Sequence, residues 1–312
     1  TTAGARGAPT RAEGPALHLA AGRSADVSLQ LRPGEERVAH LAARPVMSGY
    51  AVWSGSLDGD ANSSVTIVQG GGVTNGVVSS PGGAYRLSGF EGGPITSTRV
   101  DPRRVDHDVV LGSASASTTG SPATAPVVAS ASATTGAPTV IDVVIGWTPR
   151  AAVQAGGTAA ISSLAALAVA STNDAYARSG INVRLNLIAT AAGVGTEGTD
   201  LKGELAALRN PTDGKWDNVM ALREATKADL ASLFTSANAA SCGVAYYPKA
   251  GGADAVSVTP HDCAVDTLAF AHEIGHNLGA GHDSYTDGAT SGYYPTFGHG
   301  FVHLDTAHPD NS

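Results

Sequence analysis

The residues best suited to chemistry lie in one short segment, Leu268 to Asp283, which reads LAFAHEIGHNLGAGHD. His272 and His276 are four residues apart, so on a helix both imidazoles lie on one face, one turn apart. Two imidazoles at this spacing can bind one tetrahedral metal ion. Gly279 is the expected end of the helix, because glycine adopts the left-handed C-terminal position with little strain. The chain can then return, which makes His282 a candidate third ligand.

Three neutral imidazoles leave one position of a zinc ion open for water, an arrangement typical of catalytic rather than structural zinc sites. Glu273 directly follows His272, so its carboxylate lies beside the metal site without being needed as a ligand. It can take a proton from an attacking water and later give that proton to a leaving amine. The segment therefore predicts one catalytic Zn²⁺ and hydrolysis of an amide bond. The simpler interpretations are a helix that carries three histidines by coincidence and a zinc site without catalysis.

The sequence HEIGHNLGAGHD resembles the extended zinc motif of the metzincin metallopeptidases. Asp283, directly after the third histidine, is similar to the adamalysin or reprolysin branch and its bacterial relatives. The resemblance implies a zincin-like catalytic domain with a five-stranded mixed sheet and an active-site helix. It also implies the roles of the motif residues: zinc ligands His272, His276 and His282, general base Glu273, and a structural residue, Asp283.

The segment before the motif, Cys242 to Tyr247, resembles the same branch. The resemblance implies that an edge strand there pairs with an extended peptide substrate, through Gly243, Val244, Ala245 and Tyr246. The physics agrees, because an exposed sheet edge offers unpaired N–H and C=O groups to a peptide backbone. The alternative is a sheet edge with no role in substrate binding.

Cys242 and Cys263 are the two cysteines of the chain. They lie close together in a region with other signs of an exported enzyme, so a disulfide is favoured over two free thiols. A cysteine-based metal site would need more soft ligands than this region contains. The chain starts at Thr1 without a basic-then-apolar leader, so we expect a secreted protein whose signal peptide has been removed.

Residues 139–312 are predicted to form the α/β domain that positions the motif. Apolar and alternating runs predict strands over Val140–Gly146, Ile181–Thr190, Asp229–Phe234, Gly243–Tyr247 and Ala255–Thr259. Apolar residues at helical spacing predict helices over Pro149–Arg178, with a break near Gly156 and Gly157, and over Leu201–Leu208, Asp217–Thr226 and Thr267–Leu278. Asp266 is the expected N-cap of the last helix.

The N-terminal part of the chain has a different character. Residues 1–16 carry no apolar period and are predicted to form a disordered arm. Residues 17–110 contain short alternating segments separated by Gly, Pro, Asn and Asp, a pattern typical of antiparallel strands with tight turns and no helix. Residues 111–138 are an uncharged linker rich in Ala, Ser and Thr. This linker is either a plain connection or the site of an activating cleavage.

An all-β domain, a cleavable linker and a zinc peptidase together suggest a precursor, or zymogen, whose N-terminal domain inhibits the enzyme. The segment from Val52 weakly resembles a prodomain of the adamalysin branch. A cysteine cannot block the zinc, because residues 1–241 contain no cysteine. The densest cluster of alternative ligands is Asp101, Asp106, His107 and Asp108, which can equally be a solvated end of the domain. We expect cleavage within residues 111–138 to raise activity.

The composition of the chain limits the partners that it can bind, and one element of the metzincin pattern is missing from the sequence. Lys and Arg number 19 against 27 Asp and Glu, so the net charge of −8 disfavours nucleic acid and anionic membranes as partners. No run approaches the roughly 20 apolar residues that span a bilayer. Metzincins carry a Met-containing turn after the third histidine, but Met47 and Met220 both precede it, so the catalytic domain is predicted to be C-terminally incomplete.

Asp283, Asp287 and Asp305, at and after the end of the zinc motif, are too scattered to match a calcium-binding loop, so the sequence makes no prediction about calcium. Two alternatives to a peptidase remain. One is a zinc-stabilised binding module without enzymatic activity, and the other is a zinc amidase that acts on a non-protein substrate. A protein or peptide substrate is favoured over a non-protein one, because the predicted edge strand can pair with a peptide backbone.

Overall fold

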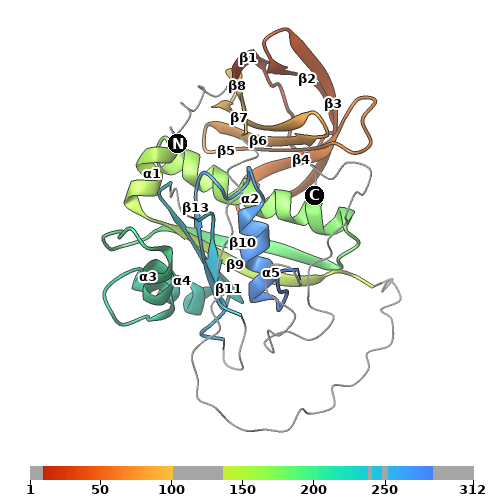
Figure 1. Ribbon diagram of the computed structural model, residues 1–312. Coiled ribbons are helices and arrows are strands. Elements are labelled where there is room, and N and C mark those ends of the chain that lie inside the picture. The colour runs from red at the N-terminus through yellow and green to blue at the C-terminus, as the bar shows by residue number, and fades with distance from the viewer. Residues whose placement is uncertain (1–9, 101–135, 238–240, 248–251, 284–312) are drawn as a thin grey trace, which may run out of the picture.

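A computed structural model of the chain describes residues 10–100, 136–237, 241–247 and 252–283. Two parts are visible in Figure 1, and we name them the β-domain (residues 10–100) and the α/β domain (residues 136–283). The long helix α2 (Thr158–Arg178) lies between the sheets of the two parts. The predicted linker up to residue 135, the Asp101–Asp108 cluster and the C-terminal residues 284–312 lie outside the described residues.

The β-domain is one antiparallel sheet of eight strands in the order β1-β8-β7-β6-β5-β4-β3-β2. The sheet curls toward closure, since a Cβ atom added to Gly14 in β1 would lie 3.1 Å from Cβ of Gln30 in β2. A near-barrel of this kind leaves little open strand edge. The strands are β1 (Arg11–Ala16), β2 (Ala25–Arg32), β3 (Glu35–Met47), β4 (Tyr50–Leu57), β5 (Ser64–Gly70), β6 (Val73–Ser80), β7 (Gly83–Phe90) and β8 (Pro94–Arg99).

The predicted disordered arm over residues 1–16 is wrong for Arg11–Ala16, which forms β1 and pairs with β8. Backbone hydrogen bonds to a neighbouring strand order this segment, and they need no apolar period in the sequence. Strand β8 is not predicted from the sequence either, because Ile95 is its only large apolar residue. The described residues of the β-domain contain strands and turns but no helix, as predicted.

The α/β domain contains the five-stranded mixed sheet that was expected, in the order β10-β9-β11-β13-β12. The first four strands of this order are parallel, and β12 runs antiparallel to β13 at one edge. Every residue of β11 and β13 is buried, as strands covered on both faces require. The strands are β9 (Thr139–Trp147), β10 (Val183–Ala192), β11 (Leu230–Thr235), β12 (Val244–Ala245) and β13 (Val256–Pro260).

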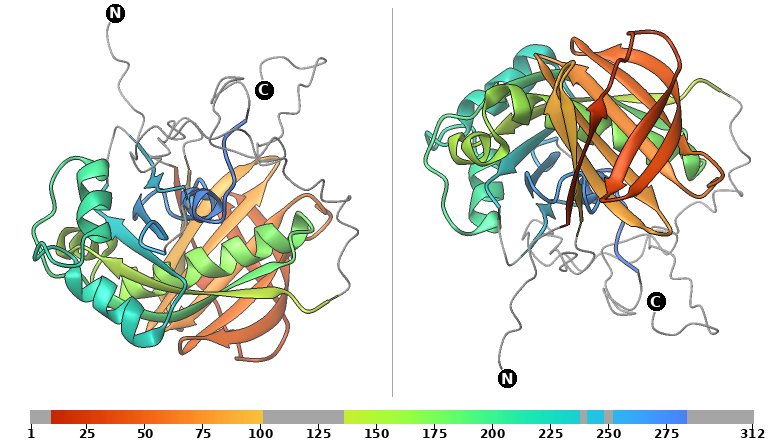
Figure 2. Two further views of the ribbon diagram at one scale, coloured as in Figure 1. Left: turned by 90° about the horizontal axis from the view of Figure 1, so that it is seen from below. Right: turned by 90° about the horizontal axis from the view of Figure 1, so that it is seen from above.

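Helices cover both faces of this sheet (Figures 1 and 2). One face packs against α1 (Pro149–Ala155), α2 and α5 (Ala269–Asn277), and the other against α3 (Leu201–Arg209) and α4 (Asp217–Thr226). The predicted helix break is confirmed, because Gly156 and Gly157 have φ of 98° and 114°. Among the described residues no single helix is both long and apolar enough to cross a bilayer; α1 and α2 meet this criterion only as a pair, which is bent by 91°.

Candidate metal centre

Helix α5 carries the histidine motif and is anchored by its apolar residues. Phe270 and Ile274 are fully buried, and the Phe270 ring meets the edge of Phe234 in β11 at a centroid distance of 5.9 Å. The predicted N-cap is wrong. The Asp266 carboxylate instead forms an ion pair with Arg86 of the β-domain at 2.8 Å, and Leu268, with φ of 55°, precedes the helix.

The helix ends as predicted at Gly279, whose φ of 97° lies in the left-handed region. Its N–H donates to the carbonyl of His276 at 2.9 Å, and the N–H of Ala280 donates to the carbonyl of Gly275 at 2.9 Å. These two bonds form a Schellman motif, which reverses the chain direction with the helix carbonyls satisfied. The reversal brings His282 back toward α5.

The structure brings the three predicted imidazoles together. One nitrogen from each of His272, His276 and His282 lies within 4.8 Å of the others, and the Nε2 atoms of His272 and His276 are 3.0 Å apart. Ligands on a tetrahedral zinc with Zn–N bonds near 2.0–2.1 Å are about 3.3 Å apart, so this donor set fits such an ion. His276 is buried, His282 half-buried and His272 exposed, which leaves the centre open on one side.

The orientation of His276 is set by a bond that the sequence does not reveal. Its Nδ1 lies 2.7 Å from the carbonyl oxygen of Ala280, just after the helix. Because a carbonyl oxygen only accepts, Nδ1 donates to it, and Nε2 is the nitrogen that faces the other imidazoles. A hydrogen bond of this kind fixes the tautomer and direction of a metal-binding histidine.

The Glu273 carboxylate rests against the backbone at the start of the edge strand. Glu273 is 1% exposed, and a Cβ atom added to Gly243 would lie 2.5 Å from its carboxyl carbon. No side chain therefore fits at position 243 while Glu273 keeps its place. The sequence marks Gly243 as part of the edge strand, but its contact with Glu273 is a finding of the structure.

The edge strand is present but shorter than predicted. Regular pairing covers Val244 and Ala245, opposite Val258 and Ser257 of β13, rather than all of Gly243–Tyr247. In the described sheet β12 is the last strand on its side. The Tyr246 ring packs under the guanidinium of Arg209 from α3, with 5.1 Å between the guanidinium carbon and the ring centroid.

Asn277 is a residue of the site that sequence reasoning missed. Its side chain is buried, and its amide nitrogen lies 2.8 Å from the carbonyl oxygen of Tyr246 and 3.0 Å from that of Val256. One side chain on α5 thus holds the ends of β12 and β13 to the metal-site helix. A polar residue directly beside His276, on a helix that must be buried, is the signal that could have identified it.

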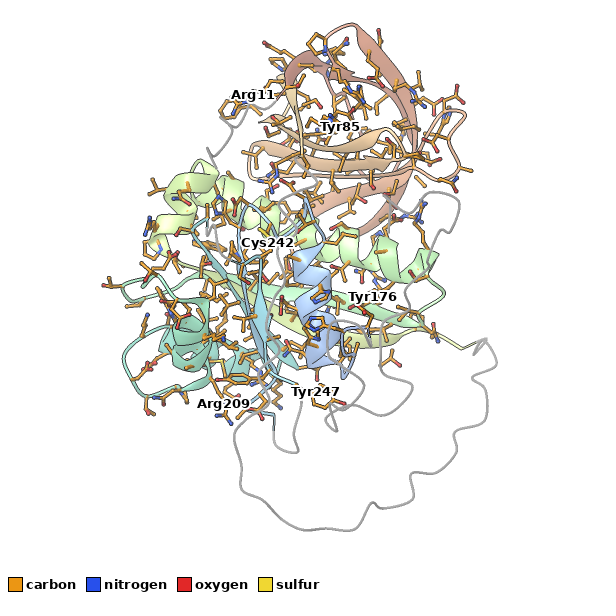
Figure 3. All side chains as sticks on the ribbon, viewed as in Figure 1. Arg11, Tyr85, Tyr176, Arg209, Cys242 and Tyr247 are labelled. Atoms are coloured by element: carbon orange, nitrogen blue, oxygen red, sulfur yellow. A yellow bond between two sulfur atoms is a disulfide. The ribbon has the colours of Figure 1, made fainter. Side chains whose placement is uncertain are left out.

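The predicted disulfide between Cys242 and Cys263 is present. It joins the residue before Gly243 to the turns that precede α5, so the start of the edge strand and the start of the helix are cross-linked. In Figure 3, Cys242 lies near the end of α5 that faces the β-domain, and Tyr247 near its opposite end. The Tyr247 hydroxyl lies 3.8 Å from the position of a Cβ atom on Gly279.

Replacing both cysteines by serine is expected to lower the free energy of unfolding by about 3 kcal/mol, because the cross-link closes a loop of 21 residues. The measurement is urea denaturation of the variant and of the parent protein, both without reductant. Reductant should shift the parent toward the variant and leave the variant unchanged. Equal urea midpoints for the two proteins would contradict the expectation.

Two further titratable residues lie outside the histidine cluster, and burial shifts the pKa of each. Burial lowers the pKa of His261, whose Nδ1 lies 3.2 Å from the carbonyl oxygen of Thr235. Burial also raises the pKa of Tyr176 to about 12, and its hydroxyl donates to the carbonyl of Ala271 at 3.4 Å. Both side chains are therefore neutral near pH 7. Asp283 is half-buried directly after His282.

Comparisons with known proteins agree with this geometry. The model of the reprolysin-like M12B metallopeptidase family matches residues 137–301. The chain is also similar in fold to metalloproteinase-II from Bacteroides fragilis, with a TM-score of 0.52, 12% identity, and 85% of this chain and 83% of that chain covered. This coverage exceeds the share of the chain from residue 139 onward, so the likeness in fold extends into the β-domain.

Curated relatives that match the chain carry the name peptidyl-Asp metalloendopeptidase. The chain is 31% identical to the protein from Stenotrophomonas maltophilia strain R551-3 over 244 residues, which are 78% of this chain and 56% of the relative. It is 29% identical to the protein from Xanthomonas campestris pv. campestris over an alignment of 265 residues that covers 81% of this chain and 62% of the relative. The chain thus spans about three fifths of the length of these two relatives. The family match covers more than half of the chain and includes the whole histidine motif, so the chain belongs to the reprolysin-like M12B family of metallopeptidases.

Proposed function

We propose that the protein is a secreted zinc metalloendopeptidase in precursor form, which hydrolyses internal peptide bonds. The observation that carries this proposal is the convergence of three imidazoles on one point with a buried carboxylate on the adjacent residue. The family match and the name shared by the curated relatives support it. The disulfide is consistent with an oxidising extracellular environment.

In this proposal His272, His276 and His282 hold one Zn²⁺. When bound there, the ion would supply Lewis-acid chemistry: it would polarise a substrate carbonyl and lower the pKa of a water. Glu273 takes the proton of that water and delivers it to the nitrogen of the leaving amine. The fixed contact with Gly243 limits the carboxylate to a small range of positions, so little reorganisation accompanies the proton transfers. Asp283 has a structural role after the third ligand.

The substrate backbone is proposed to lie along Gly243, Val244, Ala245 and Tyr246. Strand β12 is the last strand on its side of the described sheet, and an extended peptide can add to such an edge as a further strand. The same segment contacts Glu273 through Gly243, so a peptide bound there lies next to the general base. Because the relatives are named for peptidyl-Asp bonds, peptides with an internal aspartate are the first substrates to test.

Replacing Asn277 by alanine is expected to raise KM for such a peptide about tenfold and to change kcat less. The substitution removes the side-chain donor from the carbonyls of Tyr246 and Val256, and the Val256 carbonyl keeps only the backbone N–H of Tyr246 at 3.4 Å. This loosens the substrate-binding edge but not the metal ligands. Steady-state kinetics with an aspartate-containing peptide provide the measurement.

The matched control is Asn218→Ala, which also removes a side-chain amide bonded to a backbone carbonyl, that of Ala192, but away from β12. It should leave both constants near those of the parent. A fall in kcat at unchanged KM for Asn277→Ala would argue against this positioning role.

The precursor form is proposed from the order of the domains. The β-domain precedes the peptidase, and the linker composition suits cleavage by a protease. The β-domain is the proposed inhibitor, with the Asp101, Asp106, His107 and Asp108 cluster as candidate zinc-blocking groups in place of a cysteine. Unchanged peptide hydrolysis after a clean cut within residues 111–138 would end the zymogen proposal.

The proposed activity is tested with the purified full chain on a casein-like protein, with and without a zinc chelator, together with metal analysis. We expect one zinc per chain, loss of hydrolysis with chelator, and recovery when zinc is restored. Zinc without protein hydrolysis, before and after the linker is cut, would favour a binding module or an amidase. Hydrolysis that survives complete metal removal would overturn the proposal.

A further inference from the structure

Helix α2 is buried on all sides along its centre. Every residue from 163 to 172 is buried, over almost three turns. A helix that lies on one sheet and faces water on its other side buries only one stripe of residues. Helix α2 therefore needs an apolar partner on each side, and the sheet of the α/β domain provides only one of them.

The second partner is the outer face of the β-domain. Strands β4, β5 and β6 pack against α2, and their residues alternate between two apolar clusters. The residues of the first set fill the interior of the near-barrel: Trp53, Ile67 and Val78. Their neighbours in the chain belong to the cluster that contains α2 and the α/β sheet: Val52, Val68 and Val77. The core of the α/β domain thus continues into the β-domain.

Polar contacts surround the apolar contact between α2 and the β-domain. The Tyr50 hydroxyl donates to Ser162 at 2.8 Å, and near the end of α2 the Arg178 guanidinium donates to the carbonyl of Ser63 at 2.8 Å. Beyond α2, Arg86 pairs with Asp266 ahead of the metal-site helix. An apolar centre with a polar rim is the anatomy of a stable protein interface. Figure 1 shows the β-domain on the side of α2 opposite the α/β sheet.

We propose that the β-domain remains bound as a lasting subunit after the linker is cut, so that the cleaved protein is a two-chain complex. This inference rests on the proposed cleavage in the linker, but not on the peptidase activity. Interfaces with a continuous apolar core are typical of obligate complexes, whose parts are not stable separately. Release of the β-domain would expose the apolar side of α2 to water, a patch that soluble monomers rarely carry. Activation by cleavage would then act without domain release.

The test uses the full chain with the substitution Glu273→Ala, which prevents self-cleavage, and with a recognition site for a sequence-specific protease inserted within residues 111–135. After complete cutting, the sample is diluted to about 1 μM and run on a size-exclusion column without denaturant. We expect both fragments to elute together at the volume of the uncut chain. Separate elution, or precipitation of the α/β fragment with the β-fragment left in solution, would overturn the proposal.

Two valine substitutions test whether the cut fragments associate through the face of the β-domain that packs against α2. Val77→Asp places a charge in the shared cluster and is expected to weaken association of the cut fragments more than tenfold. Val38→Asp introduces the same change at a valine of the same domain that is 41% exposed, and it should leave association unchanged. Equal association of the two variants would contradict the assignment. Circular dichroism shows whether each β-fragment is folded.

Should Val77→Asp fail to fold, Arg86→Ala replaces it, with Arg37→Ala as control. Arg86 pairs with Asp266 across the interface, whereas Arg37 donates only within the β-domain, to the carbonyl of Asp58. Arg86→Ala should speed the dissociation of the cut fragments several-fold, and no change relative to Arg37→Ala would count against the proposal. Elution does not depend on hydrolysis, so a failed peptidase assay and a failed association assay are separate results.

Discussion

Replacement of Glu273 by alanine is expected to lower kcat/KM for peptide hydrolysis by about 10²–10⁴-fold while the zinc content stays at the parent level. In the proposed mechanism this carboxylate moves the protons, and the three imidazoles that would hold the metal are separate from it. Loss of the proton acceptor therefore removes the chemical step and spares metal binding. Activity on an aspartate-containing peptide and metal analysis of the same preparation provide the two readouts.

The matched control is Glu224→Ala, which removes an exposed carboxylate from α4. It should leave both activity and zinc content unchanged. Zinc loss in Glu273→Ala would show that this carboxylate supports the metal, and the assigned role as base would then be wrong. Full activity of Glu273→Ala would rule out the mechanism.

Gly243→Ala is expected to lower kcat/KM by about 10²-fold, although the residue has no reactive group. The added methyl group would occupy space taken by the Glu273 carboxyl, whose carbon would be only 2.5 Å away. Either the carboxylate or the edge strand must move, and a displacement of about 1 Å at a catalytic group is enough for a loss of this size.

Gly203→Ala is the control for this substitution. It adds the same methyl group in α3, where the nearest atom, in the Asp200 carboxylate, is 3.6 Å away. This variant should keep full activity and be slightly more stable, since alanine favours a helix more than glycine does. Equal activity of Gly243→Ala and Gly203→Ala would show that Glu273 has more freedom than the structure gives it.

The metal centre is predictable from the sequence because its parts are local. The helical spacing of His272 and His276 and the glycine at position 279 act within a few residues, and the structure confirms the helix, its end and the return of His282. The contacts of Asn277 and Gly243 are not predictable in this way. They depend on how β12 lies against α5, which no short sequence window contains.

Long-range contacts also explain which predictions from the sequence were wrong. Asp266 has the residue type and position of an N-cap, but Arg86, 180 residues earlier in the chain, binds its carboxylate instead. Strand β1 is ordered by pairing with β8 at the far end of the domain. The alternation in β4, β5 and β6 indicates strands with one buried face, whereas α2 also covers the outer face, so both faces are buried.

The alanines of α2 set the distance between the two halves of the molecule. Ala165, Ala166 and Ala168 are fully buried between layers that approach them from opposite sides. Larger side chains there would push the layers apart, and overpacking of this kind typically costs about 1–3 kcal/mol. Substitutions that inactivate the protein are therefore expected in the centre of α2, which has no part in the proposed substrate binding, as well as around the three histidines.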